Sequence, residues 1–359
     1  MELLSVTMND GVKPRSEIAG KDNSSEDKSN YKIVRKGDMV YNSMRMWQGA
    51  NGISPCDGIV SPAYTVLMPK REISNGYFAA LFKSTKLLNE FRKNSQGMTS
   101  DTWNLKYPQI ETIKVQIPSV SEQNKVSALF SVLDARIVAQ AQLVESLKKY
   151  KRGLSTAVLS TNSELFPKRT VASLGELFPF IRNGFVGTVT PFFTSQENGV
   201  RYLQGTNIHD GKISDETAFY VTQDFNQKHS KNILKSDDIL VVQSGHVGEC
   251  AVVGDNYAGS NCHALIIMSN GGECASDYIC QYINSDDGKK KIAAITTGNT
   301  IKHILATSIA NIEIPLPSKK DQQRIAELLN SWDNRIEQEI SSLCKLVRIK
   351  EGLLQQLFI

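Results

Sequence analysis

The stretch PSVSEQNKVSALFSVLDARI, residues 118–137, decides the architecture of this chain, because a similar stretch returns 199 residues later as PSKKDQQRIAELLNSWDNRI, residues 317–336. Each copy has a proline, a serine, an acidic residue three positions after that serine, and then regularly spaced apolar residues. A serine followed three residues later by an acidic residue, just before an apolar run, marks the N-terminus of a helix. The sequence therefore predicts two long helices that begin alike.

Both segments carry an apolar repeat of seven residues, which is typical of helices that pair along one seam. Two polar interruptions coincide in the repeats, Gln140 with Glu339 and Lys151 with Lys350. A helix of about 35 residues is about 50 Å long, more than a globular domain needs, so we expect a pair of spacer helices. The expected seam residues are Val126, Phe130, Leu133, Ile137, Val144, Leu147 and Leu154 in the first helix, and Ile325, Leu329, Trp332, Ile336, Leu343, Leu346, Leu353 and Leu357 in the second.

The segments before the two helices also correspond, for example residues 61–68 with 260–267. They contain short apolar runs between glycine and proline turns, which predict strands, and each ends in an expected closing strand, at 113–118 and 312–317. A constant separation indicates a tandem duplication. The region from about 171 to Tyr202 has no counterpart before Met1, so we expect the first domain to be N-terminally incomplete.

The predicted fold class is therefore α+β, with two β-rich α/β domains alternating with two long α-helices that pair as an antiparallel coiled coil. The expected boundaries are 1–118 for the first domain, 119–160 for the first spacer helix, 161–317 for the second domain and 318–359 for the second spacer helix.

Composition limits the classes of function. The net charge of +4, with 40% hydrophobic and 22% charged residues, permits an acidic partner without requiring one. We find no run of 18 apolar residues and no secretory segment, so we expect a cytoplasmic protein without a membrane span. The spacings of Cys250, Cys262, His263, Cys274 and Cys280 match no zinc motif, so we expect buried thiols and no metal.

Enzyme motifs are missing from the sequence. There is no glycine-rich phosphate loop, no strand–GxGxxG–helix unit, and no Asn/Asp-Pro-Pro-aromatic motif of an amino-methyltransferase. A stand-alone methyltransferase or nuclease is therefore the least favoured function.

The duplicated plan resembles the DNA-specificity subunit of Type I restriction-modification systems. The resemblance rests on the Ile-Pro…Ser-x-x-Glu/Asp-Gln motifs at 117–123 and 314–322, on the Leu-x-x-x-Asp-x-x-Ile pattern of the second copy at 329–336, with the corresponding stretch at 132–137, on Leu174-Gly175-Glu176, and on the Lys-x-Gly-Leu helix ends. It extends over the whole chain.

The resemblance implies two target-recognition domains that each read half of a split sequence in double-stranded DNA. It implies spacer helices that set the gap and dock two methyltransferase subunits, with restriction subunits joining the full complex. One DNA turn is about 34–36 Å, so a spacer of about 50 Å has a suitable scale. The resemblance also implies that the subunit itself is non-catalytic, with S-adenosylmethionine, ATP and magnesium expected in its partners. An alternative is a truncated or rearranged variant that acts only as an assembly scaffold or half-site reader.

Candidate DNA contacts lie in polar turns and basic segments at matching places of the two repeats. Gln is suited to adenine and Arg to guanine, whereas Lys binds phosphates. Tight structural turns and solvated helix faces would explain the same residues. The candidates are Arg45, Trp47, Gln48, Asn51, Lys83, Lys86 and Lys106 in the first domain, and Gln243, Ser244, His246, Lys289, Lys290, Asn299 and Lys302 in the second.

A methyltransferase dock is expected on helix residues outside the seam. The candidates are Leu129 and Arg136 in the first helix, with Leu328 and Arg335 at the matching places of the second.

Overall fold

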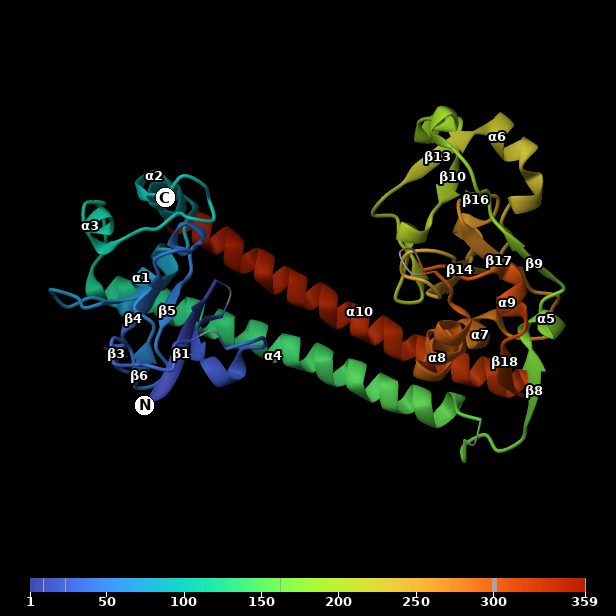
Figure 1. Ribbon diagram of the computed structural model, residues 1–359, viewed down its shortest axis with the longest axis horizontal. Helices are drawn as coiled ribbons and strands as arrows, with labels where there is room; N and C mark the ends of the chain where they lie inside the picture. Colours follow the sequence, from blue (N-terminus) through green and yellow to red (C-terminus); the bar gives the residue numbers. More distant parts are fainter. Residues whose placement is uncertain (9, 23, 162, 299–301, 359) are drawn as a thin grey trace. The chain divides into compact units, whose positions relative to one another are not determined.

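A computed structural model describes residues 1–359 except 9, 23, 162, 299–301 and 359. The described chain divides into two compact units. Unit 1 comprises Met1–Leu143 with Glu339–Ile359, and unit 2 comprises Val144–Gln338. Each unit thus contains one β-rich domain and a part of each long helix, and each is described by itself (Figure 1).

Unit 1 contains two small sheets. The first has the strand order β2-β1-β6-β3, in which β1 and β6 are parallel, and the second has the antiparallel order β5-β4-β7. Helices α1, α2 and α3 follow. The bounds are β1 Glu2–Thr7, β2 Gly11–Pro14, β3 Lys32–Val34, β4 Met39–Asn42, β5 Asn51–Ile53, β6 Gly58–Val60, β7 Tyr64–Leu67, α1 Asn75–Leu81, α2 Thr85–Asn94 and α3 Tyr107–Ile110.

Unit 2 repeats this plan with additional strands. Its sheets have the orders β13-β10-β16, β11-β12, β15-β14-β17-β9 and β18-β8. The strands are β8 Arg169–Ser173, β9 Phe180–Asn183, β10 Gly199–Leu203, β11 Ile208–His209, β12 Lys212–Ile213, β13 Phe219–Thr222, β14 Ile239–Val242, β15 Cys250–Val252, β16 Asn261–Cys262, β17 Leu265–Ser269 and β18 Glu313–Pro317. The helices are α5 Leu174–Leu177, α6 Gln223–Lys228, α7 Ser276–Asn284, α8 Asp286–Ile295 and α9 Ala306–Ala310.

Matched hydrogen bonds identify the equivalent positions of the two domains. Oδ2 of Asp38 accepts from the backbone N–H three residues earlier at 2.8 Å, and Oδ2 of Asp238 does the same at 2.9 Å. These aspartates are 200 residues apart, and the N-cap residues Ser84 and Ser285 are 201 apart. The constant separation of 199 predicted from the sequence is therefore wrong inside the domains, because their loops differ in length.

The glutamine after each helix cap fastens the helix to its own domain. Oε1 of Gln123 accepts from the N–H of Ser74 at 3.0 Å, and Oε1 of Gln322 accepts from the N–H of Ala275 at 2.9 Å. Each Nε2 donates to the carbonyl of the proline five residues earlier at 2.9 Å. Both glutamines are 1% exposed, so their amides satisfy buried backbone groups that water cannot reach.

The long helices are α4, Val120–Leu159, and α10, Lys319–Gln356. Their predicted seam positions are buried or half-buried, and most of the intervening residues are exposed. The fully buried ones are Phe130, Val144, Ile325, Leu329 and Ile336, and the half-buried ones are Val126, Leu133, Ile137, Leu147, Leu154, Trp332, Leu343, Leu346 and Leu353.

The polar interruptions of the seam find partners on the opposite helix. In unit 1, Nε2 of Gln140 donates to the carboxylate of Glu339 at 2.6 Å, and Nζ of Lys350 lies 2.5 Å from Asp134. In unit 2, Nζ of Lys151 lies 2.6 Å from a carboxylate oxygen of the matching Asp333. As α4 advances from 134 to 140, its partner on α10 moves back from 350 to 339, so these segments are antiparallel.

The last predicted seam position is wrong. Leu357 is 44% exposed because α10 ends at Gln356, and Phe358 is buried in its place. The ring of Phe358 stacks on Phe130 at 6.0 Å and meets Tyr77 edge-on at 5.3 Å.

Helix α4 also departs from the expectation about membrane segments. By length and composition alone it could cross a membrane, with a mean hydropathy of 1.2 over 18 residues, of which 6% are buried. The sequence predicts no membrane span, and α4 is the one helix of the described residues that meets these criteria. The helix also carries Asp134, which pairs with Lys350, and a carboxylate is costly to place in lipid, so length and composition alone are weak evidence for a span.

An important difference between the units lies beside the central sheet. In unit 2, β17 pairs with β14 on one side and β9 on the other, and Leu265–Met268 are fully buried. In the described part of unit 1, β7 pairs with β4 alone, and all its residues are half-buried. The described residues of unit 1 thus leave one edge of β7 without a backbone partner.

The expected closing strand at 113–118 is also wrong. Its counterpart β18 pairs with β8, and Ile314 in β18 is fully buried. Residues 113–118 form no strand, and Val115 is 38% exposed. Residues 113–118 and 312–317 have similar sequences, but the described residues of unit 1 contain no strand equivalent to β8 with which 113–118 could pair.

These open edges predict unequal protection of the two units against hydrogen exchange. The amides of β17 bond on both sides, whereas roughly half of those in β7 have no partner in the ladder. We expect the amides of β7 to exchange at least about tenfold faster than those of β17. Hydrogen–deuterium exchange with mass spectrometry on the full chain measures this difference, and equal protection would show that another segment covers β7.

Candidate nucleic-acid interface

Three elements meet at equivalent places in the two domains. In unit 1 they are the turn after β4, helix α2 and the loop after α2, and in unit 2 they are the turn after β14, helix α8 and the loop after α8. In unit 2 the N–H of Ile304 donates to the carbonyl of Gln243 at 3.1 Å, and in unit 1 the N–H of Leu105 donates to that of Ser43 at 2.8 Å. The same backbone contact therefore holds the turn and the loop together in each unit.

In unit 2 these elements enclose a cavity of about 490 Å³. Three predicted DNA contacts, His246, Lys289 and Lys302, line it. Gly245 and Gly248, whose φ angles of 86° and 91° suit glycine, shape the turn at its edge. Glu249 also lines the hollow, but the two ammonium groups outnumber its single carboxylate and can attract the phosphate oxygens of a nucleic acid.

The other candidates of unit 2 lie around this cavity. Ser244 is exposed and forms a backbone bridge with His303. Gln243 is half-buried, and its Oε1 is buried without a hydrogen-bond partner. Lys290 is exposed and pairs with Asp287 of its own helix at 3.1 Å. Asn299 lies outside the described residues.

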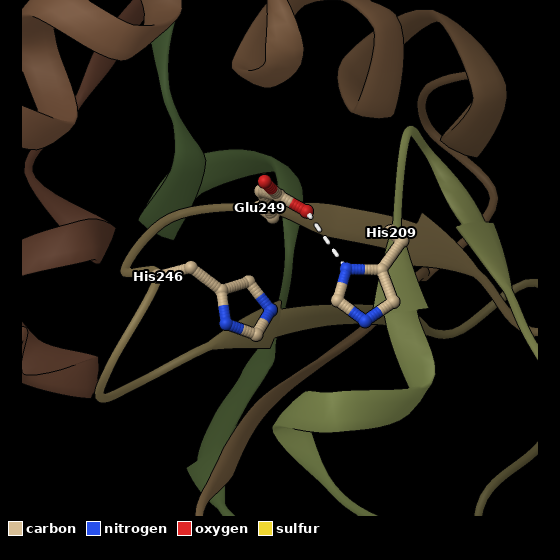
Figure 2. Close-up of side chains that lie close together, drawn as sticks. All are labelled: His209, His246 and Glu249. Carbon is tan, nitrogen blue, oxygen red and sulfur yellow. Dashed lines mark ion pairs between the residues drawn. The ribbon is translucent and has the colours of Figure 1, made fainter. Parts of the chain in front are cut away.

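Two residues of the cavity lining, His246 and Glu249, belong to a group of side chains that the sequence alone does not predict. Figure 2 shows His209 at the end of the short β11 strand, facing His246 and Glu249 of the turn. Nδ1 of His209 is 3.9 Å from Oε2 of Glu249, and the two imidazole rings stack at 5.1 Å. The histidines are 37 residues apart in sequence, a spacing that suggests no motif.

In unit 1 the equivalent place carries aromatic and basic side chains. The rings of Trp47 and Trp103 meet edge-on at 5.0 Å, and the Arg92 guanidinium lies 5.8 Å from the Trp47 ring. Arg45 is exposed and lies 4.0 Å from Asp101, and Gln48 is half-buried in the same turn. Aromatic faces with cations can stack on bases and contact phosphates, so this surface also suits nucleic acid.

One candidate of unit 1 proves to be wrong, and the structure places another beside the helices. Asn51 is fully buried, and its Nδ2 donates to the carbonyl of Gly49 at 3.1 Å, so it cannot reach a base edge. Lys83 lines a different cavity of about 610 Å³ with Asp134 and Lys350. Burial and the neighbouring Lys350 ammonium lower the pKa of Lys83, whose side chain also packs beside Gly49 of the turn.

The remaining basic candidates of unit 1 are exposed but do not match those of unit 2. The N-caps Ser84 of α2 and Ser285 of α8 are 201 residues apart. Lys86 on α2 therefore corresponds to Asp287 on α8, a residue of opposite charge. Lys106 precedes α3. The two domains therefore share the backbone of this surface but differ in its side chains.

Comparisons with known proteins bear directly on this duplicated arrangement. The family model for the Type I restriction modification DNA specificity domain matches residues 6–149 and 169–344, one match for each repeat. The chain belongs to this family. It is a specificity subunit with DNA target-recognition domains and has no catalytic role of its own.

Individual relatives agree with the family match. The Type I restriction enzyme MjaVIII specificity subunit of Methanocaldococcus jannaschii is 26% identical over 322 residues, which are 85% of this chain and 74% of that protein. The fold is similar to that of the S subunit of a Type I system from M. genitalium, with a TM-score of 0.59, 16% identity, and 91% and 84% of the two chains covered. A chain from a study of complex assembly and conformational transition of the type I R-M system gives a TM-score of 0.60, 17% identity, and 92% and 83% coverage.

The cavity in unit 2 predicts how salt affects DNA binding. If Lys289 and Lys302 each contact a phosphate, replacing either by alanine should lower affinity at low salt and reduce the slope of log affinity against log salt by about 1. The control is Lys235→Ala, an exposed lysine before β14 that does not line the cavity. Fluorescence anisotropy with the assembled methyltransferase measures the slopes, and unchanged slopes in both variants would exclude this surface.

Proposed function

We propose that this chain directs a Type I restriction-modification complex to a bipartite sequence in double-stranded DNA, each β-rich domain reading one half. The observation that carries the proposal is the recurrence of one three-element surface in both units, with different side chains on each. Two copies of one identical reader would suit a symmetric target. Two unlike readers suit two different half-sites.

Within the two surfaces, we assign contacts by the chemistry of each side chain. Lys289 and Lys302 contact phosphates, and Ser244 approaches base edges from the turn between them. In unit 1, Trp47 and Arg45 take the corresponding places, with Lys86 and Lys106 as additional phosphate contacts. The exposure of these basic side chains supports the assignment.

We further propose that each unit docks one methyltransferase subunit on an apolar flank of its long helix. In unit 1, Leu129 and Val132 are 45% and 69% exposed, and Arg136 follows one turn later. In unit 2, Leu328 is 39% exposed, with Arg335 seven residues beyond it. Residues spaced by three, four or seven lie on one helix face, and exposed apolar residues there favour a protein partner.

The paired helices then set the gap between the half-sites. Restriction subunits complete the assembly, S-adenosylmethionine, ATP and magnesium act in the partner subunits, and the complex works on cytoplasmic DNA. This assignment leaves the chain with recognition and assembly as its tasks.

Stoichiometry tests the two docks separately. Leu129→Asp and Leu328→Asp should each reduce the number of bound methyltransferase subunits from two to one, and the double variant should bind none, because a carboxylate in an apolar interface is costly to desolvate. The control is Ser131→Asp, which adds the same charge to an exposed position of α4 that points away from the face of Leu129, Val132 and Arg136. Native mass spectrometry counts the subunits. Two bound subunits in the double variant would place the dock elsewhere.

Mapping of modified bases tests bipartite recognition. The chain, assembled with its methyltransferase, should methylate a two-part motif with a fixed gap in a random plasmid library. Variants in the unit 2 cavity should relax one half of this motif only. Methylation that depends on a single half-site, or none at all, would favour the scaffold alternative, and methylation regardless of sequence would reject the function.

A further inference from the structure

His209, His246 and Glu249 form a cluster in unit 2 that DNA reading alone does not explain (Figure 2). One potential ligand atom from each residue lies within 4.8 Å of the others. The three come from two segments of the chain, the β11–β12 hairpin and the turn before β15. The cluster therefore brings two nitrogen donors and one oxygen donor to one point.

The hydrogen bonds of His209 prepare it to bind a cation. Its Nε2 lies 2.9 Å from the carbonyl oxygen of Thr206, which can only accept, so the proton of the neutral ring is on Nε2. Nδ1 then carries a lone pair, and it faces Glu249 in Figure 2. Histidines that bind metals usually donate their other N–H to a carbonyl or carboxylate in this way.

Glu249 provides the complementary observation. Its Oε2 is buried without a hydrogen-bond partner. The closest cationic candidate, Nδ1 of His209, is 3.9 Å away, which is beyond hydrogen-bond distance. Leaving a carboxylate oxygen dry and unbonded is unfavourable, and a cation between these groups removes the penalty.

We propose that His209, His246 and Glu249 bind one divalent transition-metal ion of the zinc class. Two imidazoles and a carboxylate are the borderline donors that such ions prefer, and three protein ligands leave one position for water. This goes against the sequence-based expectation of no metal in the chain.

Binding requires only small movements. Bonds of about 2.0–2.2 Å draw the three ligand atoms closer together than they now lie. His209 is exposed and His246 half-buried, so both side chains have room to rotate. Nε2 of His246 is 3.1 Å from the carbonyl oxygen of Ile208. Coordination through Nε2 replaces that contact, whereas coordination through Nδ1 keeps it.

The ion would join the β11–β12 hairpin to the turn that lines the unit 2 cavity. Asp210 and Gly211 at the hairpin tip have φ angles of 50° and 81°, as expected in a tight turn. The turn contains Gly245 and Gly248, both at positive φ, and His246 and Glu249 lie in and directly after it. A metal cross-link would therefore fix the conformation of a loop proposed to approach DNA.

Metal titration of the full chain tests the proposal. The parent is Cys344→Ser, which removes the exposed thiol as a competing zinc ligand. After treatment with EDTA and removal of the chelator, calorimetry with Zn²⁺ should show one ion per chain, and Co²⁺ should give the visible absorption of a site containing nitrogen ligands. His209→Ala and Glu249→Gln should each weaken binding by at least about tenfold.

Two controls keep the test specific. His229→Gln and Glu273→Gln remove the same kinds of side chain elsewhere in unit 2 and should bind like the parent. Zn²⁺ should raise the melting temperature of the parent and controls and have no such effect on the ligand variants, whose folding is checked by circular dichroism. Absence of stoichiometric binding by the parent, or parent-like binding by both ligand variants, would overturn the proposal.

Discussion

Each unit depends on an ion pair that joins its two helix segments across the seam. The pairs are equivalent, since Asp134 and Asp333 are repeats of one position and so are Lys350 and Lys151. Each aspartate meets the lysine of the other repeat. An intact pair adds little to stability, but removing one partner would leave a charge beside an apolar seam. A shift of the helices by one heptad would separate the pairs, so these charges fix the register.

The register matters because each helix is also fixed to a domain. Gln123 and Gln322 lie at the first turn of their long helices. Each hydrogen-bonds to the backbone N–H of the N-cap residue of a domain helix, α1 in unit 1 and α7 in unit 2. A buried amide with two partners has little freedom to move, since losing either contact leaves a dry polar group. Within each unit, the apolar seam and the ion pair fix one long helix against the other, and the glutamine fixes a long helix to the domain helix that precedes α2 or α8.

These constraints explain how much could be predicted from the sequence. Helix caps, seam positions and the repeat depend on residues close in sequence, and the structure buries or half-buries every predicted seam residue except Leu357. Asn51 is wrong as a DNA contact because its burial depends on segments that fold over it. The strand predicted at 113–118 needs a partner strand that local pattern cannot supply. His209 and Glu249 could not be paired from sequence, because a hairpin and a turn bring them together.

The residues that hold each domain together are the same in the two repeats, whereas the residues at the proposed DNA surface differ. The groups that hold the domains together, such as Asp38 with Asp238 and Gln123 with Gln322, are identical in the two repeats. The groups at the proposed DNA surface differ, with tryptophans and arginines in unit 1 and a histidine with lysines in unit 2. Because the turn and loop are joined through backbone hydrogen bonds, their side chains can vary without disturbing the seam. A duplicated scaffold with unlike surfaces is therefore what two different half-sites require.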